Sequence, residues 1–227
     1  MRFKDVFSII GPSMIGPSSS HTAGAVRLGR TARRILGCLP EQADIVIYGS
    51  FAATYQGHGT DLAITAGLLD YDTDDMRIKD AAVLAEEAGL KVKFHTSSLP
   101  VAHPNTVKIM VRNGEREESV TGCSIGGGNI EIVSVNHFDI KFTAGYPTLL
   151  IFHKDRPGLI ADITDIVKQA GANIGYMEVD RKSRKGDVLT VIESDEAITS
   201  ALICRMEQIP DIQRVCLIDL TSKEGMP

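Results

Sequence analysis

The most constraining feature of the sequence is a regular alternation of strand-like and helix-like segments in its last third. The strand-like segments are short and largely apolar, and the first helical segment carries apolar side chains at three- and four-residue spacing before it stops at Gly171. In chain order the segments are 148–153, 159–170, 173–180, 187–193, 199–208 and 212–219. This order, βαββαβ, predicts a compact ferredoxin-like unit.

The N-terminal part has a less regular pattern of helices and strands. Residues 43–50 are rich in β-branched side chains and predict a strand, and two helical patterns follow on either side of a glycine-flanked break at His58. Three later segments, 91–95, 106–111 and 130–135, alternate polar and apolar residues, which predicts half-buried antiparallel strands. The glycine-rich residues 121–129 predict a turn, which either nests an anion or only connects a hairpin.

A change in composition near residues 144–147 predicts a domain boundary. The fold class expected is α+β, with an α/β domain at residues 1–145 and the ferredoxin-like domain at residues 147–227. The length of 227 residues suits two ordinary domains.

Composition excludes several broad classes. A formal net charge of −5 gives no reason to bind nucleic acid or an acidic membrane surface, and no apolar run reaches membrane-spanning length. The first ten residues lack the features of a secretory signal, so a cytoplasmic protein is expected. The four cysteines are scattered without a Cys-x-x-Cys pair, so no metal site is predicted from this chain.

The segment from Gly16 to Gly24 is the strongest candidate for a binding site. It reads Gly-Pro-Ser-Ser-Ser-His-Thr-Ala-Gly and leads into a helical pattern at residues 23–30, whose first turn any of four hydroxyl side chains can cap: Ser18, Ser19, Ser20 and Thr22. The unpaired N–H groups of a helix start bind carboxylates and phosphates, and His21 adds a side chain that titrates near neutral pH. The alternative is a serine-rich helix cap beside an exposed histidine.

The C-terminal unit resembles an ACT domain, a small regulatory module of amino-acid metabolism. The resemblance rests on Asp-Arg-Pro-Gly-Leu-Ile at residues 155–160 and on Gly-Ala-Asn-Ile at residues 171–174. It implies either a homodimeric contact between such units or an amino-acid effector site. The implied effector-binding residues are Asp155, Gly158, Leu159, Asn173 and Ile174.

The first 145 residues or so resemble the beta chain of bacterial iron-sulfur-dependent L-serine dehydratase, also called L-serine ammonia-lyase. The resemblance rests on residues 16–22, on Tyr-Gly-Ser at 48–50, on Gly-His-Gly-Thr-Asp at 57–61, on His-Pro-Asn-Thr at 103–106 and on residues 124–128. It implies conversion of L-serine to pyruvate and ammonia in amino-acid catabolism and gluconeogenesis. It also implies a [4Fe-4S] cluster as Lewis acid, ligated by a partner alpha chain without which this chain is inactive.

The resemblance assigns roles to particular residues. His58, held between two glycines, is the first candidate for the base that removes the Cα proton, and His21 is the second, as a base or as a group that fixes the substrate. The residues implied to bind the substrate are Ser18, Ser19, Ser20, Thr22, Gly59 and Thr60. The other histidines are assigned no chemistry.

Two other functions compete with this interpretation. A free-standing amino-acid sensor would use the ACT unit alone, and a scaffold would retain a degenerate site. A serine hydrolase built on Ser20 and His21 is disfavoured, because adjacent residues seldom aim a hydroxyl and an imidazole at each other and the sequence has no Gly-x-Ser-x-Gly motif.

Overall fold

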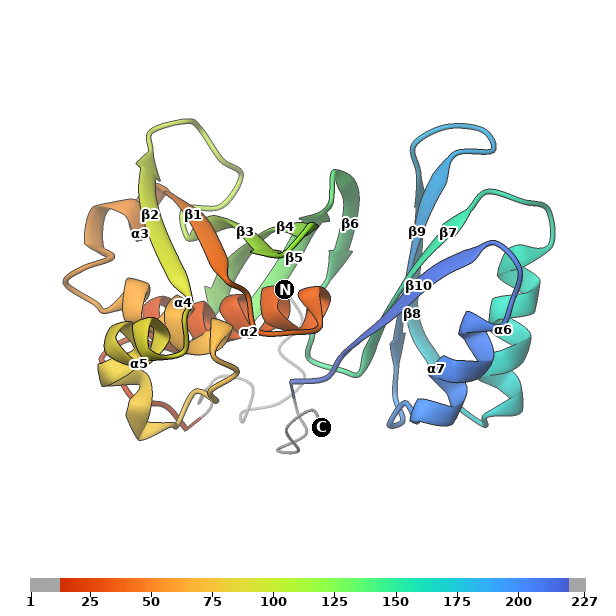
Figure 1. Cartoon of the computed structure of the whole chain (residues 1–227), viewed down its shortest axis with the longest axis horizontal. Helices are drawn as coiled ribbons and strands as arrows, with labels where there is room; N and C mark the ends of the chain where they lie inside the picture. Colours follow the sequence, from red (N-terminus) through yellow and green to blue (C-terminus); the bar gives the residue numbers. More distant parts are fainter. Residues whose placement is uncertain (1–12, 221–227) are drawn as a thin grey trace. The chain divides into compact units, whose positions relative to one another are not determined.

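The computed structural model describes residues 13–220, and Figure 1 labels its helices and strands. These residues divide into two compact units, with the division after Asn136. The predicted boundary near residue 145 lies somewhat later and stays a prediction. The expectation that no secretory signal is present concerns residues 1–10, outside the described part. None of the helices built by residues 13–220 has the length and apolar character that a membrane crossing requires.

The N-terminal unit begins with a π-helical turn, η1 (Ser19–Ala23), that continues directly into the helix α2 (Gly24–Leu36). α2 is longer than the predicted segment and ends where Gly37 adopts a left-handed conformation, with φ of 82°. The other helical elements of this unit are α3 (Gly49–Thr54), α4 (Thr60–Leu68), the 3₁₀ turn η2 (Met76–Asp80) and α5 (Ala81–Glu87).

The strands of the N-terminal unit lie in the order β2-β1-β3-β4-β5. Their bounds are β1 (Gln42–Tyr48), β2 (Lys91–Ser97), β3 (Thr106–Asn113), β4 (Arg116–Gly126) and β5 (Asn129–Val135). Strands β1, β3, β4 and β5 pair antiparallel, but β2 pairs with β1 in parallel. The prediction of an antiparallel strand at 91–95 is therefore wrong, because the chain returns to the sheet through helices rather than a tight turn.

Strand β4 was not predicted from the sequence, because Gly122 and Gly126 suggested a turn throughout this region. A Cβ atom on Gly122 would lie 2.7 Å from Leu28 Cδ2 and 2.8 Å from Ile132 Cδ1. Glycine at this strand position therefore allows close packing of α2 on the sheet. The actual turn is confined to the tip, where it connects β4 with β5 as a hairpin.

Helices α2 and α4 cross unusually closely. A Cβ on Gly67 would lie 2.1 Å from the carbonyl oxygen of Val26, and a Cβ on Gly29 would lie 2.3 Å from that of Ile64. The two glycines thus allow α2 and α4 to lie close together. His21 precedes α2 and His58 precedes α4. Buried Arg30 also contacts Asp70, just beyond α4, at 3.2 Å.

The second unit has the predicted βαββαβ order, which confirms the α+β fold class. Its elements are β7 (Thr148–Lys154), α6 (Leu159–Gln169), β8 (Ile174–Arg181), β9 (Asp187–Ser194), α7 (Ser200–Glu207) and β10 (Ile212–Ile218), preceded by β6 (Phe138–Phe142). The antiparallel sheet has the strand order β10-β7-β9-β8, and α6 and α7 lie on one of its faces (Figure 1).

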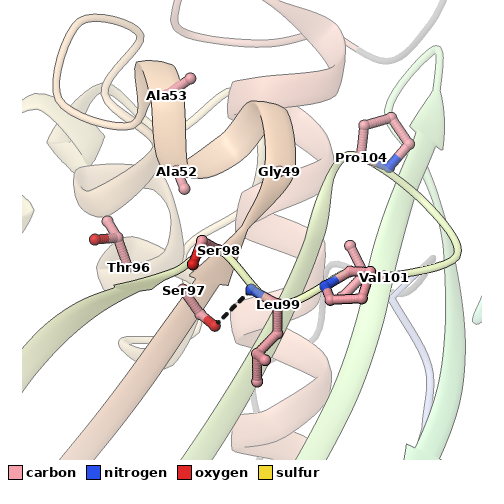
Figure 2. A pocket seen from close by; sticks show the side chains of 10 residues that line it. Gly49, Ala52, Ala53, Thr96, Ser97, Ser98, Leu99, Val101 and Pro104 are labelled. Carbon is pink, nitrogen blue, oxygen red and sulfur yellow. Dashed lines mark hydrogen bonds between the residues drawn. The ribbon is translucent and has the colours of Figure 1, made fainter.

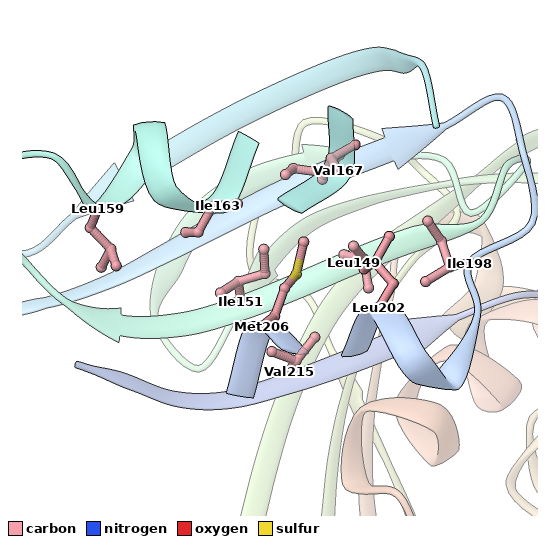
Figure 3. Close-up of a cluster of buried hydrophobic side chains, with 10 residues drawn as sticks. Leu149, Ile151, Leu159, Ile163, Val167, Ile198, Leu202, Met206 and Val215 are labelled. Atoms are coloured by element: carbon pink, nitrogen blue, oxygen red, sulfur yellow. The ribbon is translucent and has the colours of Figure 1, made fainter. Parts of the chain in front are cut away.

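The core of the second unit lies between this sheet and the two helices. Figure 3 shows apolar side chains from β7, α6, α7 and β10 that point toward one another. Ile151, Ile163 and Met206 have no exposed surface. The periodic apolar pattern of the sequence therefore corresponds to one continuous buried layer.

Candidate active site

Ser18 begins the helix that carries the serine-rich segment. Its backbone is extended, with φ of −140° and ψ of 123°, and its Oγ accepts a hydrogen bond from the backbone N–H of His21 at 3.2 Å. The Ser18 carbonyl also accepts from the N–H of Thr22 at 2.8 Å. Of the four hydroxyl residues considered as caps, the structure thus assigns the cap to Ser18.

His21 lies within a cluster of side chains from three segments. Its Nδ1 is 3.3 Å from Ser18 Oγ and its Nε2 is 3.5 Å from Ser50 Oγ. Its ring contacts the buried ring of Phe51 edge to face, with centroids 5.1 Å apart. Burial lowers the pKa of His21, and the nearby charge of His58 lowers it further. His21 is therefore held in its neutral form more readily than a free histidine.

His58 lies beside His21, in the turn between α3 and α4. The two imidazole rings have centroids 4.9 Å apart and an interplanar angle of 78°. The turn depends on Gly59, which adopts a left-handed conformation with φ of 66° at the start of α4. His58 itself is exposed. The structure thus brings together the two histidines that the sequence singled out, one half-buried and one open to solvent.

The predicted substrate-binding hydroxyls fall into two groups. Ser18, Ser19 and Ser20 are half-buried at the helix start. Thr22 and Thr60 are 2% and 0% exposed, and their Oγ1 atoms have no hydrogen-bond partner within the described residues. Buried hydroxyls are normally paired, so the Thr22 and Thr60 hydroxyls are more unusual than the half-buried serines.

Ser50 is a site residue that the sequence analysis did not assign. The motif Tyr48-Gly49-Ser50 contributes to the family resemblance, but nothing in the sequence places its serine beside His21. The connection is made by the His103-Pro104-Asn105 turn, whose Pro104 carbonyl accepts from the N–H of Ser50 at 2.7 Å. This contact between segments distant in the chain is not visible in the sequence.

A shallow cavity adjoins this part of the site. It encloses about 670 Å³ and lies between α3 and the loop that follows β2. Figure 2 shows its lining, with Gly49, Ala52 and Ala53 on α3 and Leu99, Val101 and Pro104 on the loop that follows β2. The lining is mainly apolar, and Leu99 is 68% exposed.

The predicted effector-binding residues of the second unit already have partners within it. Asp155 accepts from Arg181 Nη1 at 3.1 Å and from the N–H of Lys185 at 3.2 Å, and these contacts lower its pKa, the backbone hydrogen bond most. Asn173 donates to Asp195 from its side chain and to Glu196 from its backbone, both at 2.6 Å.

The remaining predicted effector residues lie at two ends of the sheet. Gly158 and Leu159 follow Asp155 after β7, whose Lys154 pairs with Asp187 at the start of β9, whereas Ile174 pairs with Ser194 at the end of β9. Gly158 has a φ of 84° and starts α6, Leu159 is buried, and Ile174 begins β8. Glycine at position 158 thus permits a left-handed conformation that other residues rarely adopt.

Potential metal ligands do not converge in the described part of the chain. Across residues 13–220, no three His, Cys, Asp or Glu side chains are grouped so that they could hold a metal ion. The four cysteines form no disulfide among the described residues, and Cys204 is the exposed one. The donor set that an iron-sulfur cluster needs, several converging thiolates, is therefore not provided by these residues.

Two family models match this chain. The model described as serine dehydratase beta chain covers residues 3–91, and the ACT domain model covers residues 147–211. A protein of Bacillus subtilis named probable L-serine dehydratase, beta chain, is 45% identical over 96% of this chain and 99% of its own length. The chain belongs to the serine dehydratase beta-chain family.

Two further relatives of this chain are also named L-serine dehydratases. L-serine dehydratase, beta chain, of Peptoniphilus asaccharolyticus is 39% identical over 86% of this chain and 89% of its own. L-serine dehydratase TdcG of Escherichia coli is 32% identical over 60% of this chain and 34% of its own. The sequence resemblance to both families is thereby confirmed.

Proposed function

We propose that this chain is the cytoplasmic beta subunit of an L-serine dehydratase, an L-serine ammonia-lyase that is active only with an alpha subunit. The observation that supports this proposal most directly is the pair of imidazoles, His21 and His58, 4.9 Å apart beside a helix start capped by Ser18. A small amino acid fits the needs of this arrangement, because it presents a carboxylate to the helix start and an acidic proton to a base.

In the proposed reaction, His58 removes the Cα proton of L-serine, the Cα–Cβ double bond forms as the Cβ–O bond breaks, and the departing hydroxide takes up a proton to leave as water. The aminoacrylate that results takes up water and yields pyruvate and ammonia. His58 suits the role of base because it is exposed and positioned by Gly59, whereas the ring nitrogens of His21 face two hydroxyls.

Residues at the helix start would bind the substrate carboxylate. Ser19 and Ser20 offer hydroxyl groups at the N-terminus of the continuous helix formed by η1 and α2, where unpaired N–H groups favour an anion, and Ser18 caps this start. Thr22, Gly59 and Thr60 complete the proposed substrate site.

The proposal places a [4Fe-4S] cluster on the alpha subunit. Activation of the departing hydroxyl needs an electrophile, and residues 13–220 provide no set of converging thiolates for a cluster. The partner would therefore hold the Lewis acid, and this chain the base.

Co-expression tests this proposal. The chain is produced with a cluster-bearing alpha polypeptide under anaerobic conditions, and pyruvate is measured after L-serine is added. We expect pyruvate from the pair and none from either polypeptide alone. An inactive pair whose alpha chain carries an intact cluster would refute the proposal, as would full activity of this chain alone.

We propose a regulatory role for the ACT unit in the same enzyme. It would bind an amino-acid effector at Asp155, Gly158, Leu159, Asn173 and Ile174, and would pair with a second copy. Calorimetric titration of the pair with amino acids is expected to give a heat of binding that Asn173→Ala removes while serine turnover without effector persists. Binding unchanged in that variant would exclude this site.

A further inference from the structure

Ser50 is held in place by contacts from a distant part of the chain. The Pro104 carbonyl accepts from the N–H of Ser50 at 2.7 Å and from that of Phe51 at 3.4 Å. A Cβ on the preceding Gly49 would lie 2.5 Å from the same oxygen, so the approach requires glycine. The start of α3 is therefore fixed against the 103–105 turn, and this sets the position of the Ser50 hydroxyl.

The His21 ring lies between two hydroxyls, each of which can donate one hydrogen bond and accept others. Ser18 Oγ already accepts the backbone N–H of His21, so its single proton is available to Nδ1, 3.3 Å away. Nε2 then carries the ring proton and donates it to Ser50 Oγ at 3.5 Å. This assignment pairs both ring nitrogens in one neutral tautomer, whereas the opposite tautomer would require Ser18 Oγ to accept two hydrogen bonds and Ser50 Oγ to donate to Nε2. Contacts of this length in a free enzyme commonly shorten when substrate binds.

The electrostatic environment of His21 includes one neighbouring charge that shifts its pKa. His58 is the titratable neighbour whose charge acts on its pKa. Helix α4 and strand β4 also pack against η1, and Thr60 and Ser124 of these elements are buried and uncharged. Asp61 lines a separate cavity with α5 and β2. The two serine hydroxyls are therefore the groups that can select the tautomer of His21.

We propose that Ser50 is a positioning residue, which together with Ser18 holds His21 as the neutral Nε2–H tautomer. His21 then orients the substrate, and proton abstraction is left to His58. This inference rests on the proposed function, because it assigns separate tasks to the two histidines of that site.

Nuclear magnetic resonance of the full chain tests the tautomer directly. With ¹⁵N-labelled histidine, the ring nitrogens of His21 are expected to show a single Nε2–H form in the natural sequence. Ser50→Ala should produce a mixture of tautomers, and Ser50→Thr, which restores a hydroxyl, should return the single form. An Nδ1–H form in the natural sequence, or an unchanged spectrum in Ser50→Ala, would overturn the proposal.

Turnover by the reconstituted pair provides the second readout. We expect Ser50→Ala to lower kcat for L-serine by roughly 10- to 100-fold with little change in KM, the range for misplacing a reacting group. Ser50→Thr should recover most of this loss. Ser97→Ala is the matched control, because it removes a hydroxyl that accepts from the N–H of Leu99 in the neighbouring cavity.

The outcomes separate this inference from the proposed function. Unchanged kcat in Ser50→Ala, or a loss that Ser50→Thr does not recover, contradicts the role of Ser50 while serine deamination by the natural pair stands. If the natural pair fails to deaminate serine, the proposed function fails, and the tautomer spectra alone decide the role of Ser50.

Discussion

The two predicted sites of this chain differ in how their polar groups are satisfied. In the N-terminal unit, Thr22 and Thr60 have buried hydroxyls without a partner among the described residues, and His21 meets its serines at 3.3 and 3.5 Å. In the ACT unit, Asn173 makes two hydrogen bonds of 2.6 Å and Asp155 accepts from two groups. The first site is thus open to further hydrogen bonds, whereas a ligand at the second must displace existing ones.

The largest expected effect is on catalysis, at the candidate active site of the N-terminal unit. His58→Ala in the reconstituted pair should lower serine turnover by at least roughly a hundredfold, because it removes the proposed base. His95→Ala is the control, since His95 is an exposed histidine of β2 that lies 3.7 Å from Asp44. Near-normal turnover in His58→Ala would remove this residue from the mechanism. The contrast between an N-terminal site that is open to a ligand and an ACT site whose polar groups are already paired would then have no catalytic meaning.

A large effect on stability is expected when a core side chain of the ACT unit is truncated. Met206→Ala removes a fully buried side chain from the layer in Figure 3 and should lower the free energy of unfolding of the ACT unit by about 2–5 kcal/mol. Denaturant unfolding with hydrogen exchange measures each unit separately. Equal loss of protection in both units would show that they unfold as one body.

A smaller effect is expected where α2 and α4 cross. Gly67→Ala should lower the stability of the N-terminal unit by about 1–3 kcal/mol, because the added methyl would lie 2.1 Å from the Val26 carbonyl. Gly57→Ala is the matched control, since its nearest neighbour is Thr54 O at 3.7 Å. If both variants unfold at the denaturant concentration of the natural sequence, the close crossing does not limit stability.

The smallest expected effect is a change of stability with pH. His21 has a lowered pKa, so the folded state binds its proton less readily than the unfolded state does. The free energy of unfolding should therefore contain this contribution in full above the unfolded pKa of about 6.5. The contribution should be lost progressively as the pH falls from there to the lower pKa of the folded state.

Replacing His58 measures one cause of this shift. In His58→Gln, the pKa of His21 followed by nuclear magnetic resonance should rise but stay below that of a free histidine, because burial, the larger cause, remains. A His21 pKa at or above about 6.5 in the natural sequence would show that burial and His58 do not disfavour the charged ring.

The predictability of the two units from the sequence also differs. The ACT unit was predicted nearly element by element, because each of its helices and strands buries one face and so leaves a periodic apolar pattern. In the N-terminal unit, β4 was missed and β2 was assigned the wrong direction. Gly122 explains the first error, since a glycine that makes room for Leu28 looks like a turn residue in the sequence.

The sequence alone determined the local chemistry of the site. A serine ahead of a helical segment predicts a cap, glycines around His58 predict a turn, and both features are present because they depend on neighbouring residues only. Which groups meet was decided by the tertiary structure. His21 and His58 lie together, and Ser50 joins them, because α3 is anchored to the Pro104 carbonyl and α2 packs closely on α4, contacts between segments far apart in the chain.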